Sequence, residues 1–144
     1  MAKIFIDCEY NGFGGKLMSM ALVPQNPSWP EFYEELEIRD QIEPWVRENV
    51  VPHMFKAPIS YSEFQAKLSQ YLWDMRHNDI LIVADWPDDL RYFMEATITG
   101  PGERINMPTV INFRLDLNIE YNSAVPHNAL HDARAIRDVY REKQ

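Results

Sequence analysis

Four carboxylates and one histidine in this sequence have spacings that could support chemistry. Asp7 and Glu9 lie two residues apart in an apolar segment typical of a β-strand. Because side chains alternate across a strand, both carboxylates should project from the same face, where they would repel each other. An isolated Asp-x-Glu is more often a solvated strand end. The other acidic residues of the chain therefore decide whether this pair is a solvated strand end or part of a functional site.

Asp132 lies in the apolar stripe of the segment that is most clearly helical. The residues of this stripe follow the i, i+3, i+4, i+7 spacing and are Ala129, Asp132, Ala133, Ile136, Val139 and Tyr140. An ionised carboxylate on a buried helix face is costly unless it meets a cation. The arginines of the segment, which largely point elsewhere, are Arg134, Arg137 and Arg141. An internal salt bridge or a backbone hydrogen bond is the structural alternative, but a metal ion explains the placement better.

A third acidic group is the run Asp85-Trp86-Pro87-Asp88-Asp89, between a short apolar strand and a helix. Asp85 can cap this helix, and acids in the first turn also favour the helix dipole. Asp88 shares its helix face with charged residues, a pattern typical of a solvated surface. Asp89 shares its face with aromatic or small residues, namely Tyr92, Phe93 and Ala96. We therefore favour Asp89 as the inward-facing acid, with Asp88 and then Asp85 as alternatives.

Oxygen ligands in this number suit Mg²⁺ or Mn²⁺ rather than zinc or copper. Two such ions about 4 Å apart would stabilise both the attacking and the leaving oxygen of an in-line phosphoryl displacement. The formal charge of −8 argues against a protein that coats phosphates with lysine and arginine. It is compatible with a nucleic-acid enzyme whose positive charge arrives as metal ions.

His127 follows a proline and precedes the helix that carries Asp132, five residues further on. The two side chains therefore do not share one helical face, and the histidine lies on the approach loop. An imidazole that titrates near neutral pH can take a proton from an attacking water, so His127 is the candidate general base. An ordinary surface histidine is the alternative, and we assign His53, His77 and His131 to that class.

These residues must be positioned by a small set of strands and helices. The expected strands span residues 3–8, 17–23, 31–38, 80–84 and 109–113, and the expected helices span residues 41–51, 60–75, 87–97 and 128–141. The glycine-rich turn at 11–15 predicts a hairpin between the first two strands, and residues 100–106 are expected to form a loop. Residues 24–78 carry no motif that indicates chemistry.

Composition limits the class of protein. With 144 residues and 46% apolar side chains, the chain has the size of one domain, residues 1–144, with one hydrophobic core. Its single cysteine excludes an intramolecular disulfide and a cysteine-based zinc site. No apolar run approaches the roughly 18 residues needed to cross a bilayer, and the amino terminus lacks the pattern of a signal peptide. We therefore expect a soluble, cytoplasmic protein that does not bind a membrane.

Three segments resemble the exonuclease motifs of the DEDDh superfamily. The first is Phe5-Ile6-Asp7-Cys8-Glu9, and the second is Asp89 at the strand-to-helix turn. The third is His127-Asn128-Ala129-Leu130-His131-Asp132-Ala133, which is similar to the His-x-Ala-Leu-x-Asp-Ala motif of that family. The segments bracket almost the whole chain, and its short length resembles the compact bacterial and phage 3′-to-5′ exoribonuclease-like branch.

The resemblance implies an α/β fold of the ribonuclease H-like type, with a mixed central β-sheet flanked by helices. It implies that Asp7, Glu9, Asp89 and Asp132 hold two Mg²⁺ or Mn²⁺ ions and that His127 is the base. The implied reaction removes nucleoside 5′-monophosphates from the 3′ end of single-stranded or 3′-overhang nucleic acid. RNA is the expected substrate on this resemblance, with DNA as the alternative.

The chain departs from the family at positions that normally border the terminal nucleotide. Cys8 stands where threonine is frequent, Tyr10-Asn11-Gly12 replaces a threonine-containing segment, and Ala84-Asp85 replaces a His-Asn pair. These changes affect sugar and base preference rather than the chemistry. The aromatic residues expected to stack on the last base are Tyr10, Phe13 and Trp86. Those interpreted as core are Trp29, Trp45 and Trp73.

Two other functions remain as alternatives. A catalytically silent nucleic-acid-binding or dimerisation module of the same fold would be expected to lack at least one of the five polar groups, and all five are present. An endonuclease acting on RNA in a hybrid duplex shares the fold but generally lacks the third motif. A homodimer is a further expectation, because pairing would give a small domain more surface to hold its substrate.

Overall fold

The first three strands form an antiparallel meander. In the computed structural model, which describes residues 1–142, β1 (Ala2–Tyr10) pairs with β2 (Leu17–Pro24), and β2 pairs with β3 (Phe32–Glu35). The first two strands are apolar and largely buried, as expected of strands covered on both faces. In the turn between them, Gly12 adopts φ +75°, a left-handed conformation that glycine enters without steric cost.

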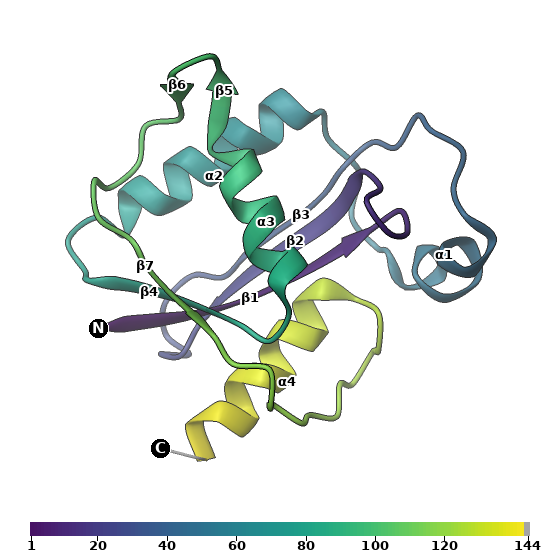
Figure 1. Ribbon diagram of the computed structural model, residues 1–144. Coiled ribbons are helices and arrows are strands. Elements are labelled where there is room, and N and C mark those ends of the chain that lie inside the picture. Colours follow the sequence, from purple (N-terminus) through teal and green to yellow (C-terminus); the bar gives the residue numbers. More distant parts are fainter. Residues whose placement is uncertain (143–144) are drawn as a thin grey trace.

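Two parallel strands complete the sheet. β4 (Ile80–Ala84) pairs with β1, and β7 (Asn112–Leu115) pairs with β4, which gives the strand order β3-β2-β1-β4-β7. The chain is therefore an α/β protein with a five-stranded mixed sheet (Figure 1). Because β1 and β4 run in parallel, their carboxyl ends meet at the same edge of the sheet.

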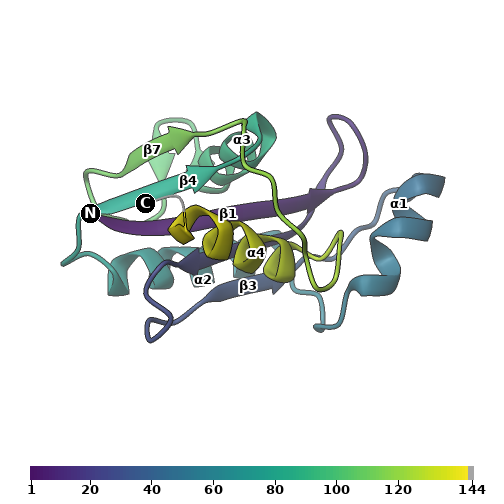
Figure 2. The same ribbon diagram turned by 90° about the horizontal axis from the view of Figure 1, so that it is seen from below.

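Helices cover both faces of the sheet (Figure 2). α2 (Tyr61–Asp74) and α3 (Pro87–Ala96) lie on one face, and α4 (Ala129–Glu142) lies on the other. Ser60 caps α2, since its side chain accepts a hydrogen bond from the Glu63 amide at 3.2 Å.

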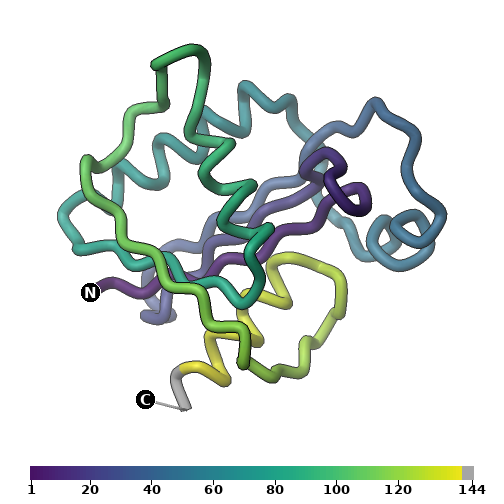
Figure 3. Tube along the Cα trace, viewed as in Figure 1, coloured from purple at the N-terminus to yellow at the C-terminus, as the bar shows by residue number. Residues whose placement is uncertain are grey.

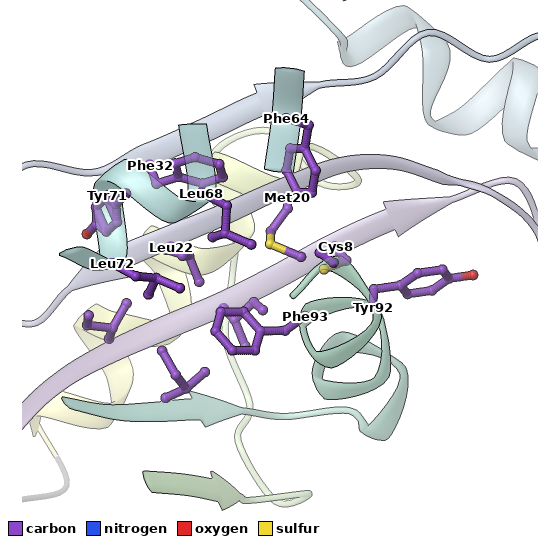
Figure 4. Close-up of a cluster of buried hydrophobic side chains, with 14 of the residues drawn as sticks. Cys8, Met20, Leu22, Phe32, Phe64, Leu68, Tyr71, Leu72, Tyr92 and Phe93 are labelled. Atoms are coloured by element: carbon purple, nitrogen blue, oxygen red, sulfur yellow. The ribbon is translucent and has the colours of Figure 1, made fainter. Parts of the chain in front are cut away.

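The side chains of β1 alternate between the two helical layers. Ile4, Ile6 and Cys8 belong to the largest apolar cluster, which packs against α2 and α3 (Figure 4). Phe5 instead packs in a second cluster with Ile136 and other residues on the α4 side. Residues Asp7 and Glu9 share the face of Phe5, so the strand period of two directs them toward α4.

A small lobe extends beyond the sheet edge at which β1 ends (Figure 3). It holds α1 (Pro44–Asn49) and the 3-10 turn η1 (Val51–His53), and its apolar side chains pack on Met18. Asn11 connects the β1–β2 turn to this lobe, because its side chain donates to the Gln41 carbonyl at 2.9 Å and accepts from the Glu43 amide at 2.9 Å. The lobe is thus attached next to the carboxyl end of β1.

Most element predictions agree with the structure, with four corrections. The strand expected at 31–38 is shorter, and only an isolated bridge between Leu36 and Ile59 follows it. The helix expected at 41–51 ends at Asn49, because Pro52 cannot continue a helical ladder and instead enters η1. The segment expected to be a loop at 100–106 belongs in part to a short hairpin, in which β5 (Ile98–Gly100) pairs with β6 (Glu103–Arg104).

The last strand is displaced from 109–113 to β7, because its register is set by pairing with β4, in which Leu81 lies opposite Asn112. Within residues 1–142, none of the helices combines the length and the apolar character needed to span a bilayer.

Candidate metal centre

Asp7 and Glu9 lie near the carboxyl end of β1 beneath the first turns of α4. The residues opposite them on β2 are small, Ala21 opposite Asp7 and Ser19 opposite Glu9. The helix residues above are small as well, and Ala129 and Ala133 are fully buried. Small side chains on both layers allow α4 to approach the sheet closely. Asp132 lies between the two alanines on the same helix face and is only 6% exposed, as its position in the apolar stripe predicted.

The second acidic contribution comes from the junction of β4 and α3. Asp89 is 2% exposed, and its Oδ1 accepts a hydrogen bond from the Cys8 amide at 3.0 Å. Asp88 points elsewhere, because it accepts hydrogen bonds from Tyr10 and forms an ion pair with Arg91 at 3.2 Å. Of the two adjacent acids, Asp89 is therefore the one that joins the buried carboxylates.

Asp85 also belongs to this cluster, although the sequence favoured Asp89 and then Asp88 over it as the inward-facing acid. The structural alternative, in which Asp85 caps α3, is wrong. The residue preceding the helix is Trp86, and no side chain provides a capping hydrogen bond there. Asp85 directly follows β4 at the sheet edge where β1 also ends. From that position its carboxylate lies with those of Asp7 and Asp89.

The acidic residues form two groups that share Asp7. One group comprises Asp7, Glu9 and Asp132, and the other comprises Asp7, Asp85 and Asp89. Within each group, one oxygen from each carboxylate lies within 4.8 Å of the others. Two adjacent sets of hard oxygen ligands with a common carboxylate are suited to two divalent cations of the Mg²⁺ or Mn²⁺ type.

Three buried oxygens in this cluster support a cation independently of its spacing. Asp7 Oδ2, Asp89 Oδ2 and Asp132 Oδ1 have no hydrogen-bond partner within the described part of the chain. Buried polar atoms almost always have a partner, and an unpaired carboxylate is especially costly. Among residues 1–142, no lysine or arginine lines the cavity of about 300 Å³ that these carboxylates face. The donor set therefore fits divalent ions.

The electrostatics of the cluster point in the same direction. Burial raises the pKa of Asp7, and the neighbouring Asp89 raises it further. Burial together with Asp132 raises the pKa of Glu9 from 4.5 to about 8. Burial also raises the pKa values of Asp85, Asp89 and Asp132, although Ser123 and His127 partly offset the effect at Asp132. Without a cation the carboxylates compete for protons, so the cluster is poised to exchange protons for metal ions.

His127 lines the same cavity from the loop that precedes α4. It is exposed and adopts φ +67°, the only positive φ among the non-glycine residues described. A residue with a β-carbon enters this region at a cost, so the surrounding structure must impose the conformation. The imidazole packs edge-to-face on Trp45, with ring centroids 5.2 Å apart. The structure thus brings all five sequence-predicted polar residues to one cavity.

The three aromatic residues expected to contact a base are placed differently. Tyr10 and Trp86 line the cavity, and both donate to Asp88, at 3.1 and 3.2 Å. Phe13 is 99% exposed at the tip of the β1–β2 turn and is not among the residues that line the cavity.

The core assignment of two tryptophans is wrong, since Trp45 is 57% exposed and Trp73 is 37% exposed. Trp29 does pack against the main core. Helical spacing misleads at position 45 because α1 lies in the lobe beyond the sheet, where only one side of the helix is covered.

Tyr121 is a cavity residue that the sequence analysis missed. It lies in the irregular segment between β7 and α4, where no periodicity predicts a direction for any side chain. A larger cavity of about 840 Å³ lies elsewhere, lined in part by Tyr92, whose ring lies tilted against that of Tyr10 with centroids 4.9 Å apart. It contains none of the clustered carboxylates, so the smaller cavity is the candidate functional site.

No protein-family model matches this chain, and no curated protein shows a significant sequence match to it.

Proposed function

We propose that this chain is a metal-dependent 3′-to-5′ exonuclease of the DEDDh type with a ribonuclease H-like fold. The observation that carries the proposal is the cluster of buried carboxylates with unpaired oxygens beside an exposed histidine. The mixed sheet flanked by helices is compatible with that fold. The substrate is single-stranded or 3′-overhang nucleic acid, RNA in preference to DNA, and the products are nucleoside 5′-monophosphates.

In this proposal Asp7, Glu9, Asp89 and Asp132 hold two Mg²⁺ or Mn²⁺ ions, and Asp85 joins them. Divalent ions bound there would stabilise the charge that develops on the attacking and leaving oxygens at phosphorus. The carboxylates cannot accept a proton readily while they bind cations. His127 is therefore the group that takes the proton from the attacking water.

The unpaired oxygens favour an enzyme over the silent binding module. A module that only binds nucleic acid gains nothing from buried carboxylates, which repel phosphates and lower the stability of the fold. It would instead be expected to present lysine and arginine. The cavity contains none of either among the described residues, so its affinity for a phosphodiester depends on bound cations.

The test is a cleavage assay on end-labelled RNA and DNA, as single strands and as duplexes with 3′ overhangs, with Mg²⁺ or Mn²⁺. A 3′ label should appear at once as mononucleotide, and a 5′ label should give a ladder of shortening products. Asp7→Asn should be inactive but folded, whereas the exposed Asp74→Asn should behave as wild type. Cuts in a circular substrate, or binding without hydrolysis under all these conditions, would exclude the exonuclease.

A further inference from the structure

A buried polar network lies beside the candidate metal centre on β3. Tyr33 pairs with Ala21, which pairs with Asp7, so the three residues form one row across the sheet. Glu35 pairs with Ser19, which pairs with Glu9, so these three residues form the next row on the same face. Residues opposite each other in antiparallel strands project from the same face. Tyr33 and Glu35 therefore lie on the α4 face, two strands away from the metal-site carboxylates.

Hydrogen bonds connect these two residues to the start of α4. The Tyr33 hydroxyl donates to Glu35 Oε2, and the Phe55 amide donates to the same oxygen at 2.9 Å. The Asn128 side-chain amide donates to the Tyr33 hydroxyl at 3.3 Å and to the His53 carbonyl at 2.9 Å. Tyr33, Glu35 and Asn128 are all at most 8% exposed. The network is therefore shielded from water, which strengthens its hydrogen bonds.

Asn128 is the residue through which this network reaches the site. It follows His127 directly, and its Oδ1 accepts a hydrogen bond from the His131 amide at 3.1 Å. Its carbonyl accepts from the Asp132 amide at 2.9 Å. One side chain thus caps α4 with its oxygen and is anchored to β3 and η1 with its nitrogen. Because Asn128 is fixed on both sides, the left-handed backbone of His127 has an identifiable support.

The segment after η1 reinforces the anchor. Lys56 donates to the Tyr33 carbonyl at 2.8 Å and forms an ion pair with Glu34 at 2.7 Å. The rings of Tyr33 and Phe55 stack with centroids 5.2 Å apart. Phe55 and Lys56 are therefore bound to β3 by hydrogen bonds, an ion pair and a ring contact. This arrangement gives a role to a part of residues 24–78 in which the sequence shows no motif.

We infer that Tyr33, Glu35 and Asn128 are positioning residues that hold His127 in its left-handed conformation over the carboxylates. The inference rests on the proposed function for its catalytic consequence. Neither Tyr33 nor Glu35 is among the residues that line the cavity, so they act through Asn128 rather than on the substrate.

Two substitutions test the network with little other change. Tyr33→Phe removes the hydroxyl that joins Glu35 to Asn128. Asn128→Ser retains an oxygen that can cap α4 but removes the amide that donates to Tyr33 and His53. Tyr71→Phe is the matched control, because Tyr71 is also 8% exposed and its hydroxyl donates to the Pro30 carbonyl at 2.8 Å, away from α4.

Both test variants should lower kcat by roughly 10- to 100-fold, the cost of a misplaced catalytic group, with KM and Mn²⁺ affinity close to wild type. Tyr71→Phe should keep wild-type kcat even if it lowers the melting temperature equally. In a His127→Ala background, Tyr33→Phe should change kcat by less than about twofold, because residues that act through one group are not additive. An equal loss of kcat with and without His127 would overturn the inference.

A readout without activity separates this inference from the proposed function. Crystal structures of wild type and of Asn128→Ser should show His127 with positive φ in the first and displaced from it in the second. An inactive wild type with this structural difference would reject the nuclease and retain the network. If Asn128→Ser does not fold, the same comparison is made with Tyr33→Phe. An unchanged His127 backbone would overturn the positioning role, whatever the activity.

Discussion

The raised pKa of Glu9 makes the stability of the metal-free protein depend on pH. In the folded chain this pKa is about 8, compared with an ordinary value of 4.5. Between these values the folded state retains a proton that the unfolded state has lost, so the free energy of unfolding falls as pH rises. The stabilising contribution is fully present below pH 4.5 and is lost as pH passes through 8. Glu9→Gln removes this dependence, because glutamine keeps the shape of the protonated acid at every pH.

The size of the effect follows from the two pKa values. The pKa difference between 4.5 and about 8 corresponds to a free energy on the order of 5 kcal/mol, at about 1.36 kcal/mol for each unit of pKa. This is an upper value, because Glu9 and Asp132 lie close enough to share one proton. Even half of it would be a large fraction of the 5 to 15 kcal/mol that stabilises a typical domain. Glu9→Gln should therefore be the more stable protein at pH 8 in the absence of metal.

Denaturant unfolding with EDTA, followed at several pH values from 4.5 to 8.5, measures this difference. The stability of Glu9→Gln relative to wild type should rise steadily across that range, while the exposed Glu48→Gln should show no such trend. With saturating Mn²⁺ the order should reverse at pH 8, since the cation stabilises wild type by mass action and binds the variant less tightly. A constant difference between Glu9→Gln and wild type at all pH values would refute the reasoning.

Three further predictions concern the other groups around the cavity. His127→Ala should lower kcat by roughly 10²- to 10⁴-fold at pH 7, recover part of it at alkaline pH and retain Mn²⁺ binding. Profiles of rate against pH measure the first two effects, and calorimetry measures the third. Wild-type turnover of His127→Ala at pH 7 would exclude His127 as the general base. Asp85→Asn should weaken one of two Mn²⁺ binding events in a calorimetric titration, whereas Asp88→Asn should leave both affinities unchanged. Equal effects of the two substitutions would show that Asp85 is not a metal ligand. Trp86→Ala should raise KM for short oligonucleotides by roughly 5- to 150-fold, the loss of one stacked base, whereas Trp73→Ala, which does not line the cavity, should leave KM unchanged.

Residues whose direction depends on local periodicity could be predicted from the sequence. The stripe in α4 predicted that Asp132 faces inward, and its 6% exposure confirms this. The same argument distinguished Asp89 from Asp88 on α3, because only Asp89 shares a face with aromatic residues. The alternation of β1 placed Asp7 and Glu9 on one face. These predictions succeed because a helix or a strand fixes the relative directions of its own side chains.

Features that depend on pairing between distant segments could not be predicted. Asp85 follows a strand and lies two residues before Pro87, a setting equally typical of a helix cap, and only the parallel pairing of β4 with β1 brings it to Asp7. Tyr33 and Asn128 are 95 positions apart, and no local pattern connects them. Trp45 lies in a segment with the apolar spacing of a helix. Whether other residues cover the helix face that carries it depends on where the lobe attaches through Asn11. In each case the missing information is a long-range contact.

The charge of the cavity explains how an acidic chain could act on an anionic substrate. Five carboxylates converge there, and burial together with their mutual repulsion raises their pKa values, which disfavours the state with five free anions. Two divalent ions would neutralise most of that charge, and only then would a phosphodiester be attracted to the cavity. Metal dependence should therefore appear in KM as well as in kcat. A positively charged binding surface would give metal-independent affinity and strong weakening by salt, whereas the proposed two-ion site would make recognition of the substrate and its chemistry depend on the same ions.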